Sequence, residues 1–113
     1  MRLQRRADGV IFADKNIEND FNYLPEDDWL KKALKKAIED LKENVFCGEN
    51  ISKKLIPKYY KDKYGLDNLW WYPLSNGWRL VYSIMTPSNL EILAAIIEYF
   101  DHKNYSRRFG YKS

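Results

Sequence analysis

Apolar side chains recur along the chain with two different periods, which predict separate helical and strand regions. Between residues 28 and 48 they recur every three or four positions, and the positions between them are mostly Lys, Glu and Asp. This pattern predicts an amphipathic helix that buries one apolar stripe, and Gly48 is expected to end it. The stripe consists of Leu30, Ala33, Leu34, Ala37, Ile38, Leu41 and Val45.

Upstream of this helix the pattern predicts a strand and then a shorter helix. Residues 9–13, "GVIFA", are rich in side chains that favour strands. Residues 15–24 place apolar side chains at positions i, i+4 and i+7 of a helix. Pro25 interrupts that pattern and fits the first turn of the helix that follows. Asp27 and Asp28 are expected to cap the same helix.

Downstream the period changes to that of strands. Residues 49–68 have no clear period and are expected to form a loop. The third of the later runs is nearly continuously apolar from Ile92 to Ile97, as is typical of a strand covered on both faces. A helix is the alternative there, because Ala94 and Ala95 favour helix, but the short connectors favour antiparallel hairpins. The three predicted strands span residues 68–74, 78–86 and 90–100.

The order of these elements predicts a single α+β domain over residues 1–113. The helices would cover one face of a small sheet, and the other face would be open or occupied by a partner. Within 78–86, Leu80, Tyr82 and Ile84 alternate and are expected to point at the helices. Arg79 would then point from the opposite face.

Composition and charge limit the possible chemistry without assigning it. Hydrophobic residues make up 45% of the chain and charged residues 31%, and the formal net charge is +3. The single Cys47 excludes an intramolecular disulfide, and with only one histidine, His102, a zinc site is not expected. No apolar run approaches the ~20 residues that a membrane-spanning helix needs. We therefore expect a soluble cytoplasmic protein without metal or cofactor.

Basic and aromatic residues gather in three segments and form a candidate site for single-stranded RNA. The segments are the lysine- and tyrosine-rich loop 53–64, Arg79 with Tyr72 on the neighbouring strand, and the C-terminal residues 101–111. Cations attract phosphates and aromatic rings stack on bases. The lysine loop has the plain alternative of being solvated surface.

Structural roles are also open for the individual candidates. Arg79 either contacts a phosphate or pairs with Glu91 or Glu98 across the sheet. His102 either takes part in chemistry or caps the last strand. The C-terminal aromatics, above all Phe109, are alternatively packing anchors; they are Tyr105, Phe109 and Tyr111.

The string "GWRLVYSI", followed by an apolar strand and "YFDHKNYSRRFGY", resembles the RelE/ParE superfamily of type II toxins. The likeness covers residues 50–111 and is greatest to the RelE and YoeB branch. It implies a small, mainly antiparallel four-stranded sheet with two N-terminal helices. It also implies an mRNA endonuclease, or mRNA interferase, that acts on the ribosome and is inhibited by a cognate antitoxin.

The resemblance also implies roles for particular residues in a metal-independent attack of the ribose 2′-hydroxyl on phosphorus. Arg79 would contact the phosphate, and His102 would donate a proton. Tyr105 or Tyr72 would stack on or orient the base, and Lys54 would accept a proton. Glu49 is the nearest carboxylate to that last position. The remaining candidates for RNA contact are Lys53, Lys58, Tyr72, Lys103, Arg107, Arg108 and Tyr111.

Two other functions remain open for the same fold. One is a ParE-like toxin that inhibits DNA gyrase without cleaving RNA. The other is a catalytically decayed RelE-fold protein that only binds a partner. The expected partners are a cognate antitoxin and ribosome-bound mRNA, with a homodimer or a toxin–antitoxin hetero-oligomer as possible assemblies, and no membrane partner.

Overall fold

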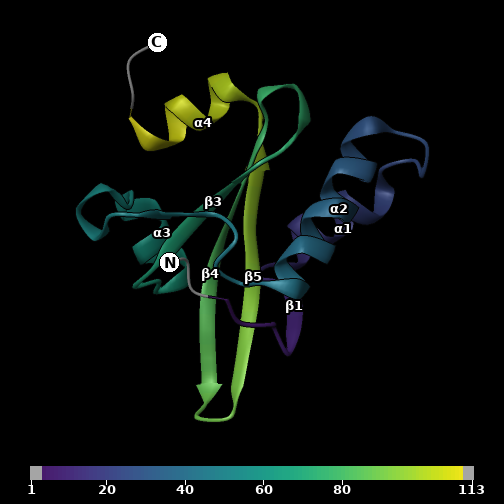
Figure 1. Ribbon diagram of the computed structural model, residues 1–113. Helices are drawn as coiled ribbons and strands as arrows, with labels where there is room; N and C mark the ends of the chain where they lie inside the picture. Colours follow the sequence, from purple (N-terminus) through teal and green to yellow (C-terminus); the bar gives the residue numbers. More distant parts are fainter. Residues whose placement is uncertain (1–3, 111–113) are drawn as a thin grey trace.

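The structure is a computed structural model that describes residues 4–110 and is built on a mixed five-stranded sheet (Figure 1). The strand order is β1-β5-β4-β3-β2; β1 runs parallel to β5, and the other neighbours are antiparallel. The strands are β1 (Gly9–Phe12), β2 (Glu49–Ile51), β3 (Leu69–Pro73), β4 (Arg79–Ser88) and β5 (Glu91–Phe100). The helices are α1 (Lys15–Tyr23), α2 (Trp29–Glu43), α3 (Lys58–Tyr64) and α4 (His102–Phe109), with short 3₁₀ turns η1 (Lys53–Leu55) and η2 (Ser75–Gly77).

Helices α1 and α2 cover one side of the sheet, which we call the α2 face. The stripe predicted on α2 packs there against the sheet, with Leu34 and Leu41 in one buried cluster with Leu80 and Tyr82. Ile84 packs against the edge of that cluster. The predicted inward direction of these β4 side chains is therefore confirmed.

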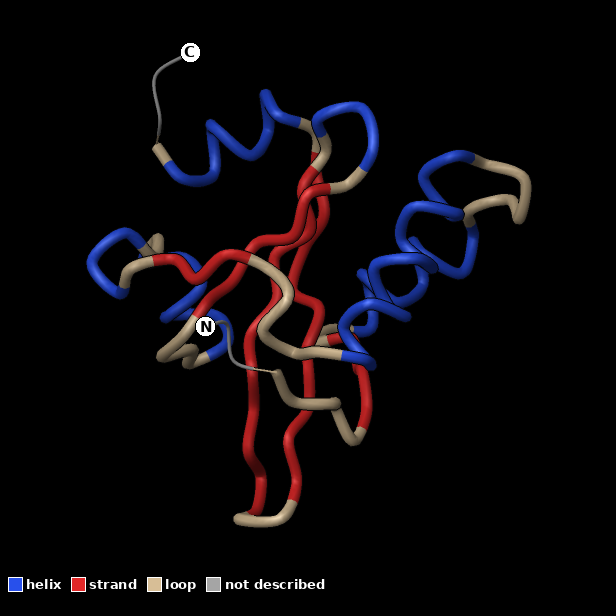
Figure 2. Tube along the Cα trace, viewed as in Figure 1, coloured by secondary structure: helices blue, strands red, loops and turns tan. Residues whose placement is uncertain are grey.

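The opposite side of the sheet, which we call the α4 face, is covered by α3 and α4 (Figures 1 and 2). Val81 and Ile97 lie there in a second buried cluster with Tyr60 of α3 and Tyr105 of α4. The prediction that this face is open or occupied by a partner is therefore wrong, because helices of the same chain cover it. Aromatic residues of the short helices α3 and α4 cover this face. The apolar stripe of α2 accounts only for the cover of the other face.

Two corrections to the predicted elements follow from the region after α2. Residues 49–68 form β2, η1 and α3 rather than a loop, and β2 makes the sheet five-stranded instead of four-stranded. These three elements have only three to seven residues each. None of them is long enough to give a periodic signal in the sequence. Helix α4 likewise was not predicted within the C-terminal segment.

The prediction that residues 90–100 form a strand rather than a helix is confirmed. β5 lies between β1 and β4, and its residues Ala94 to Ile97 are buried from both sides. Packing on both faces explains why this stretch is continuously apolar without being helical. β4 and β5 form a long hairpin that extends past the ends of their neighbours (Figure 2).

The predicted cap of α2 is confirmed at its start but not at its end. The Asp28 side chain accepts a hydrogen bond from the Leu30 N–H at 2.8 Å, whereas the helix already ends at Glu43. Gly48 is buried beyond that end, and a Cβ there would lie 2.5 Å from the Trp71 carbonyl oxygen. Close backbone approach to β3, not helix termination, requires this glycine.

Within residues 4–110, no helix combines the length and the apolar character needed to cross a bilayer. Helix α2, the longest, has 15 residues and carries charged side chains along its outer side.

Tyr82 joins the end of α2 to the sheet, and its removal should lower stability. Its buried hydroxyl donates to the Val45 carbonyl at 2.7 Å and accepts from the Gly48 N–H at 3.1 Å. Tyr82→Phe leaves both backbone groups without that partner, so we expect a loss of about 1–3 kcal/mol in the free energy of unfolding. Urea denaturation measures it.

Tyr99→Phe is the matched control, because the Tyr99 hydroxyl forms no hydrogen bond with other described residues. We expect the control to change stability by less than about 0.5 kcal/mol. Equal effects of the two substitutions would contradict the role assigned to the Tyr82 hydroxyl.

Candidate functional site

Arg79 is the first residue of β4 and is flanked by two aromatic rings on the α4 face. Its guanidinium carbon lies 4.1 Å from the ring centroid of Trp71 and 4.4 Å from that of Tyr105. Both distances are typical of cation–π contacts. Rings hold a guanidinium by its planar surfaces and leave the N–H groups at its rim available to an acceptor.

The alternative of a local ion pair for Arg79 is wrong. Among residues 4–110, Arg79 forms no ion pair, and its guanidinium donates no hydrogen bond. Glu98 pairs instead with Arg108, and Glu91 lies at the far end of the β4–β5 hairpin. Arg79 is half-buried, so an accessible cation remains at this point of the sheet without a carboxylate from the described chain.

The strand register places a carboxylate on the same face. Glu49 of β2 lies directly opposite Trp71, which lies opposite Val81. Because residues opposite one another in a ladder point to the same side, Glu49 projects from the α4 face. The sequence identified Glu49 only as the nearest carboxylate, whereas the structure aligns it with the ring that contacts Arg79.

Helix α4 presents one packed and one exposed side. Tyr105 and Phe109 point inward, with their rings stacked at 4.4 Å and an interplanar angle of 19°. His102, Lys103 and Arg107 are exposed. Tyr105 is thus both a packing anchor, as the structural alternative held, and a neighbour of Arg79; the packing role of Phe109 is confirmed.

Helix α4 begins directly after the last strand, and Asp101 caps its start. The Asp101 carboxylate accepts a hydrogen bond from the Asn104 N–H at 2.8 Å, which satisfies one of the free donors of the first turn. His102 is the first residue of the helix and is exposed. Phe100 is the cross-strand partner of Arg79. Since His102 follows Phe100 by two residues, it begins α4 near the Arg79 end of β4.

Arg108 fastens α4 to the sheet. Its Nε and Nη2 donate to the two oxygens of Glu98 at 3.1 and 3.2 Å. Its guanidinium carbon also lies 3.8 Å from the Tyr59 ring centroid, so the same side chain joins α4, β5 and α3. The sequence grouped Arg108 with RNA-binding residues, but here its charge is compensated by Glu98.

Tyr60 lies beneath this ion pair. Its hydroxyl is completely buried and meets no hydrogen-bond partner in good geometry within residues 4–110. Burial, followed by the nearby charge of Glu98, raises the pKa of the Tyr60 hydroxyl, so it stays protonated at any physiological pH.

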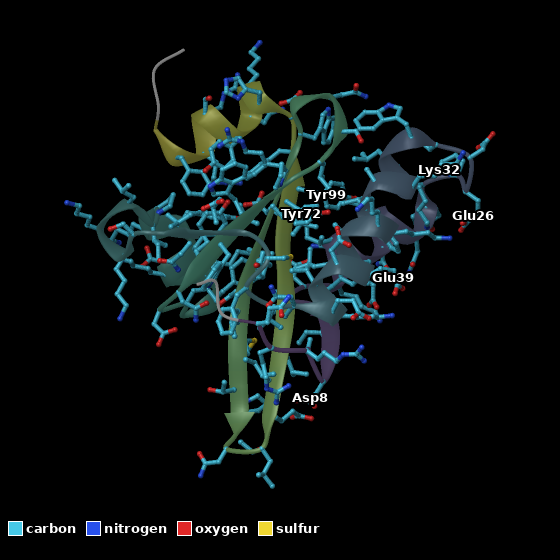
Figure 3. All side chains as sticks on the ribbon, in the orientation of Figure 1. Asp8, Glu26, Lys32, Glu39, Tyr72 and Tyr99 are labelled. Atoms are coloured by element: carbon cyan, nitrogen blue, oxygen red, sulfur yellow. The ribbon has the colours of Figure 1, made fainter. Side chains whose placement is uncertain are left out.

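Tyr72 lies on the α2 face, so its predicted grouping with Arg79 is wrong. Its hydroxyl donates to Asp40 of α2, and burial followed by that hydrogen bond raises the pKa of the Tyr72 hydroxyl. Tyr72 and Tyr99 are the cross-strand partners of Leu80 on its two sides, and both pack against the cluster under α2 (Figure 3). Trp71, one position earlier, is the residue that the alternation of side chains places beside Arg79.

The lysines of the 53–64 segment divide into paired and unpaired groups. Lys58 pairs with Asp62 at 2.9 Å, and Lys63 with Asp14 at 3.4 Å. Lys53 and Lys54 are exposed in η1 and form no ion pair within the described chain. Tyr111, also a predicted RNA contact, lies outside the described residues.

A cavity of about 470 Å³ opens beside this site, between α3, β5 and α4. Its lining includes Tyr59, Glu98, Phe100 and the exposed side chains of Asn104 and Arg107. Within residues 4–110, no three His, Cys, Asp or Glu side chains are grouped so that they could hold a metal ion.

Comparison with models of known protein families, with curated proteins and with solved structures finds no match to this chain.

Arg108 and Arg107 are adjacent arginines with different surroundings, which gives a direct test of the fastening of α4. Arg108→Ala leaves Glu98 half-buried without its two charged donors, and we expect it to lower the free energy of unfolding by about 1.5–3 kcal/mol. Arg107→Ala removes an exposed side chain, and we expect a change within about 0.5 kcal/mol. Urea unfolding of both variants provides the comparison, and similar losses would show that the Glu98 pair does not hold α4.

Proposed function

We propose that this protein is a metal-independent endoribonuclease of the RelE/ParE toxin type that cleaves mRNA on the ribosome. The observation that carries the proposal is the setting of Arg79. Its guanidinium is flanked by Trp71 and Tyr105 and has no carboxylate partner among the described residues. The guanidinium is planar, and the N–H groups along its rim can donate to two oxygens of one phosphate.

The reaction needs three groups around that phosphate. A base removes the proton of the ribose 2′-hydroxyl, which attacks phosphorus and forms a 2′,3′-cyclic phosphate. A cation stabilises the charge that develops on the phosphate oxygens, and an acid protonates the departing 5′-oxygen. Arg79 supplies the cation in this proposal.

The proton acceptor is assigned to one of two residues. Glu49 projects from the α4 face in register with Trp71, and Lys54 follows shortly after it in η1. A carboxylate is the simpler base, because it is unprotonated at neutral pH, whereas a lysine must first lose its proton. We therefore prefer Glu49 and keep Lys54 as a phosphate contact.

The proton donor in the proposal is His102. The imidazole is exposed in the first turn of α4, where it can meet the leaving oxygen of a bound strand. Histidine is suited to this role because an imidazole exchanges protons near neutral pH.

The distribution of paired charges favours a polyanionic substrate on the α4 face. On α2, most lysines have carboxylate partners, among them Lys35 with Glu26 and Lys36 with Asp40. The elements around the α4 face carry a larger set of cations without ion pairs in the described chain. That set consists of Lys53, Lys54, Lys61, Arg79, Lys103 and Arg107.

The proposal includes a protein partner. An enzyme that destroys mRNA needs an inhibitor in the cell that makes it, so a cognate antitoxin in the cytoplasm is part of the proposed function. The unpaired cations around Arg79 would attract an acidic segment of such an inhibitor as well as RNA.

The proposal is tested by replacing Arg79. Arg79→Ala removes the cation at the phosphate, and we expect cleavage of ribosome-bound mRNA to fall by about 10²–10³-fold, with loss of growth arrest on expression. Arg79→Lys keeps a charge but not the fork, and we expect only partial activity. Primer extension on mRNA from translating cells locates and quantifies the cuts.

Arg6→Ala is the control, since Arg6 is an exposed arginine paired with Glu43 away from the α4 face. It should leave cleavage unchanged, and thermal unfolding should show that every variant is still folded at the assay temperature. A fully toxic, RNA-cleaving Arg79→Ala protein would overturn the assignment. Gyrase inhibition with intact transcripts would identify the ParE-like alternative, and absence of any growth effect would favour a protein that only binds a partner.

A further inference from the structure

One border of the sheet has an open backbone edge. β1 lies at the end of the strand order, and among the described strands its neighbour is β5 alone (Figure 2). Within residues 4–110, no backbone hydrogen bond joins Gly9–Phe12 to any element other than β5. The outer side of β1 therefore presents unpaired N–H and C=O groups, which are a template for another strand.

Two other edges of the sheet are protected against such pairing. β2, at the opposite border, begins with the exposed Glu49. Where β3 ends, the side-chain amide of Asn68 binds the N–H and the C=O of Ile84, at 2.8 and 2.9 Å. Pro87, further along the same edge of β4, has no N–H to donate. Charges and prolines are usual means of protecting an edge, and β1, with the sequence "GVIF", contains neither.

The register of β1 on β5 decides which backbone groups point outward. The Ala13 N–H donates to the Ile96 carbonyl of β5 at 2.8 Å. Because alternate residues of a strand direct their backbone groups to the same edge, the N–H and C=O of Ile11 also face β5. Those of Val10 and Phe12 face outward.

We propose that β1 pairs antiparallel with β1 of a second copy of this chain, about a two-fold axis at Ile11. Val10 of each copy then lies opposite Phe12 of the other, and each such pair exchanges both N–H···O bonds through its outward groups. The proposal concerns assembly and does not rest on the proposed endoribonuclease function.

The side chains of β1 suit this pairing on both faces of the sheet. Val10 and Phe12 pack against the cluster under α2 and are half-buried. Ile11 points to the α4 face and is 41% exposed. In the dimer the two Ile11 side chains meet at a position without hydrogen bonds between the strands, where opposite side chains approach most closely. The pairing thus covers apolar surface that a single copy exposes.

The charges that flank β1 are compensated within their own chain. The axis brings Asp8 of one copy opposite Asp14 of the other. Asp8 accepts a hydrogen bond from the Ile92 N–H at 2.8 Å and pairs with Arg5 at 3.4 Å. Asp14 caps α1 and accepts from the Tyr64 hydroxyl at 2.9 Å. The pairing therefore does not bring two uncompensated carboxylates together.

A dimer of this kind places both candidate sites on one side of the assembly. The axis is perpendicular to the sheet, so the two five-stranded sheets become one continuous sheet and both α4 faces point the same way. The contact uses four residues of each strand, which is small beside the interfaces of permanent dimers. We therefore expect a reversible dimer whose population rises with protein concentration.

The proposal is tested by analytical ultracentrifugation of the full chain over a wide range of concentrations. We expect the mass to rise from that of one chain, 13.6 kDa, towards twice that value. Ile11→Lys and Ile11→Glu each place like charges opposite one another, and each variant alone should remain monomeric. An equal mixture of the two should recover the dimer, because opposite charges then face each other across the axis.

Leu90→Lys is the matched control, because Leu90 is 88% exposed in the turn between β4 and β5, beyond the end of β1. It should dimerise as the parent does. Circular dichroism should show that every variant is folded, since position 11 is exposed and neither charge is buried there.

Hydrogen exchange of the parent chain gives a second measurement that needs no substitution. The amide protons of Val10 and Phe12 should exchange more slowly as concentration rises, because they become bonded in the dimer. A parent chain that stays monomeric would rule the proposal out. So would a dimer that Ile11→Lys leaves intact, or a mixture of the two charged variants that remains monomeric.

Discussion

The fastening of α4 to the second face of the sheet is the constraint on which the candidate site depends. Apolar packing and an ion pair both hold the helix. Tyr105 and Phe109 enter the cluster around Tyr60, and Arg108 binds Glu98. Without this packing Tyr105 would not lie beside Arg79, and the cavity next to β5 would lose one wall. The structural role of α4 therefore precedes any chemical role of its exposed side chains.

The same packing gives some positive charges a role in the fold and leaves others exposed, where they can attract a polyanion. Arg108 and Arg107 are neighbours in sequence, yet one is compensated by a carboxylate and stacked on Tyr59, and the other is exposed without an ion pair in the described chain. Composition cannot make this distinction, because both residues contribute equally to the net charge of +3. Only the unpaired cations can contribute fully to attraction of a polyanion.

The α4 face joins three chemical features that lie apart in the sequence. Glu49, Arg79 and Glu98 come from different strands and reach one side through the ladder register. A carboxylate, a cation held by rings and a lined cavity are the features that an enzyme acting on one strand of RNA would use. This convergence supports the proposed function more than any one residue does.

The sequence by itself determined the elements with long or regular patterns. The stripe of α2, the alternation of β4 and the apolar run of β5 were predictable because burial of one face imposes a period on many consecutive residues. The fold class followed from their order, and Arg79 was found from its place beside that alternation.

Tertiary structure decided everything that rests on short elements and on pairing. β2 and α3 are too short to give a period, and α4 has only two apolar positions, Tyr105 and Phe109, so the covered second face was not predictable from the pattern. The choice of Trp71 over Tyr72 as the neighbour of Arg79, and of Glu98 as the partner of Arg108, depends on strand register and helix docking. Contacts between distant residues are set by the packing of the whole chain, which no local window of sequence contains.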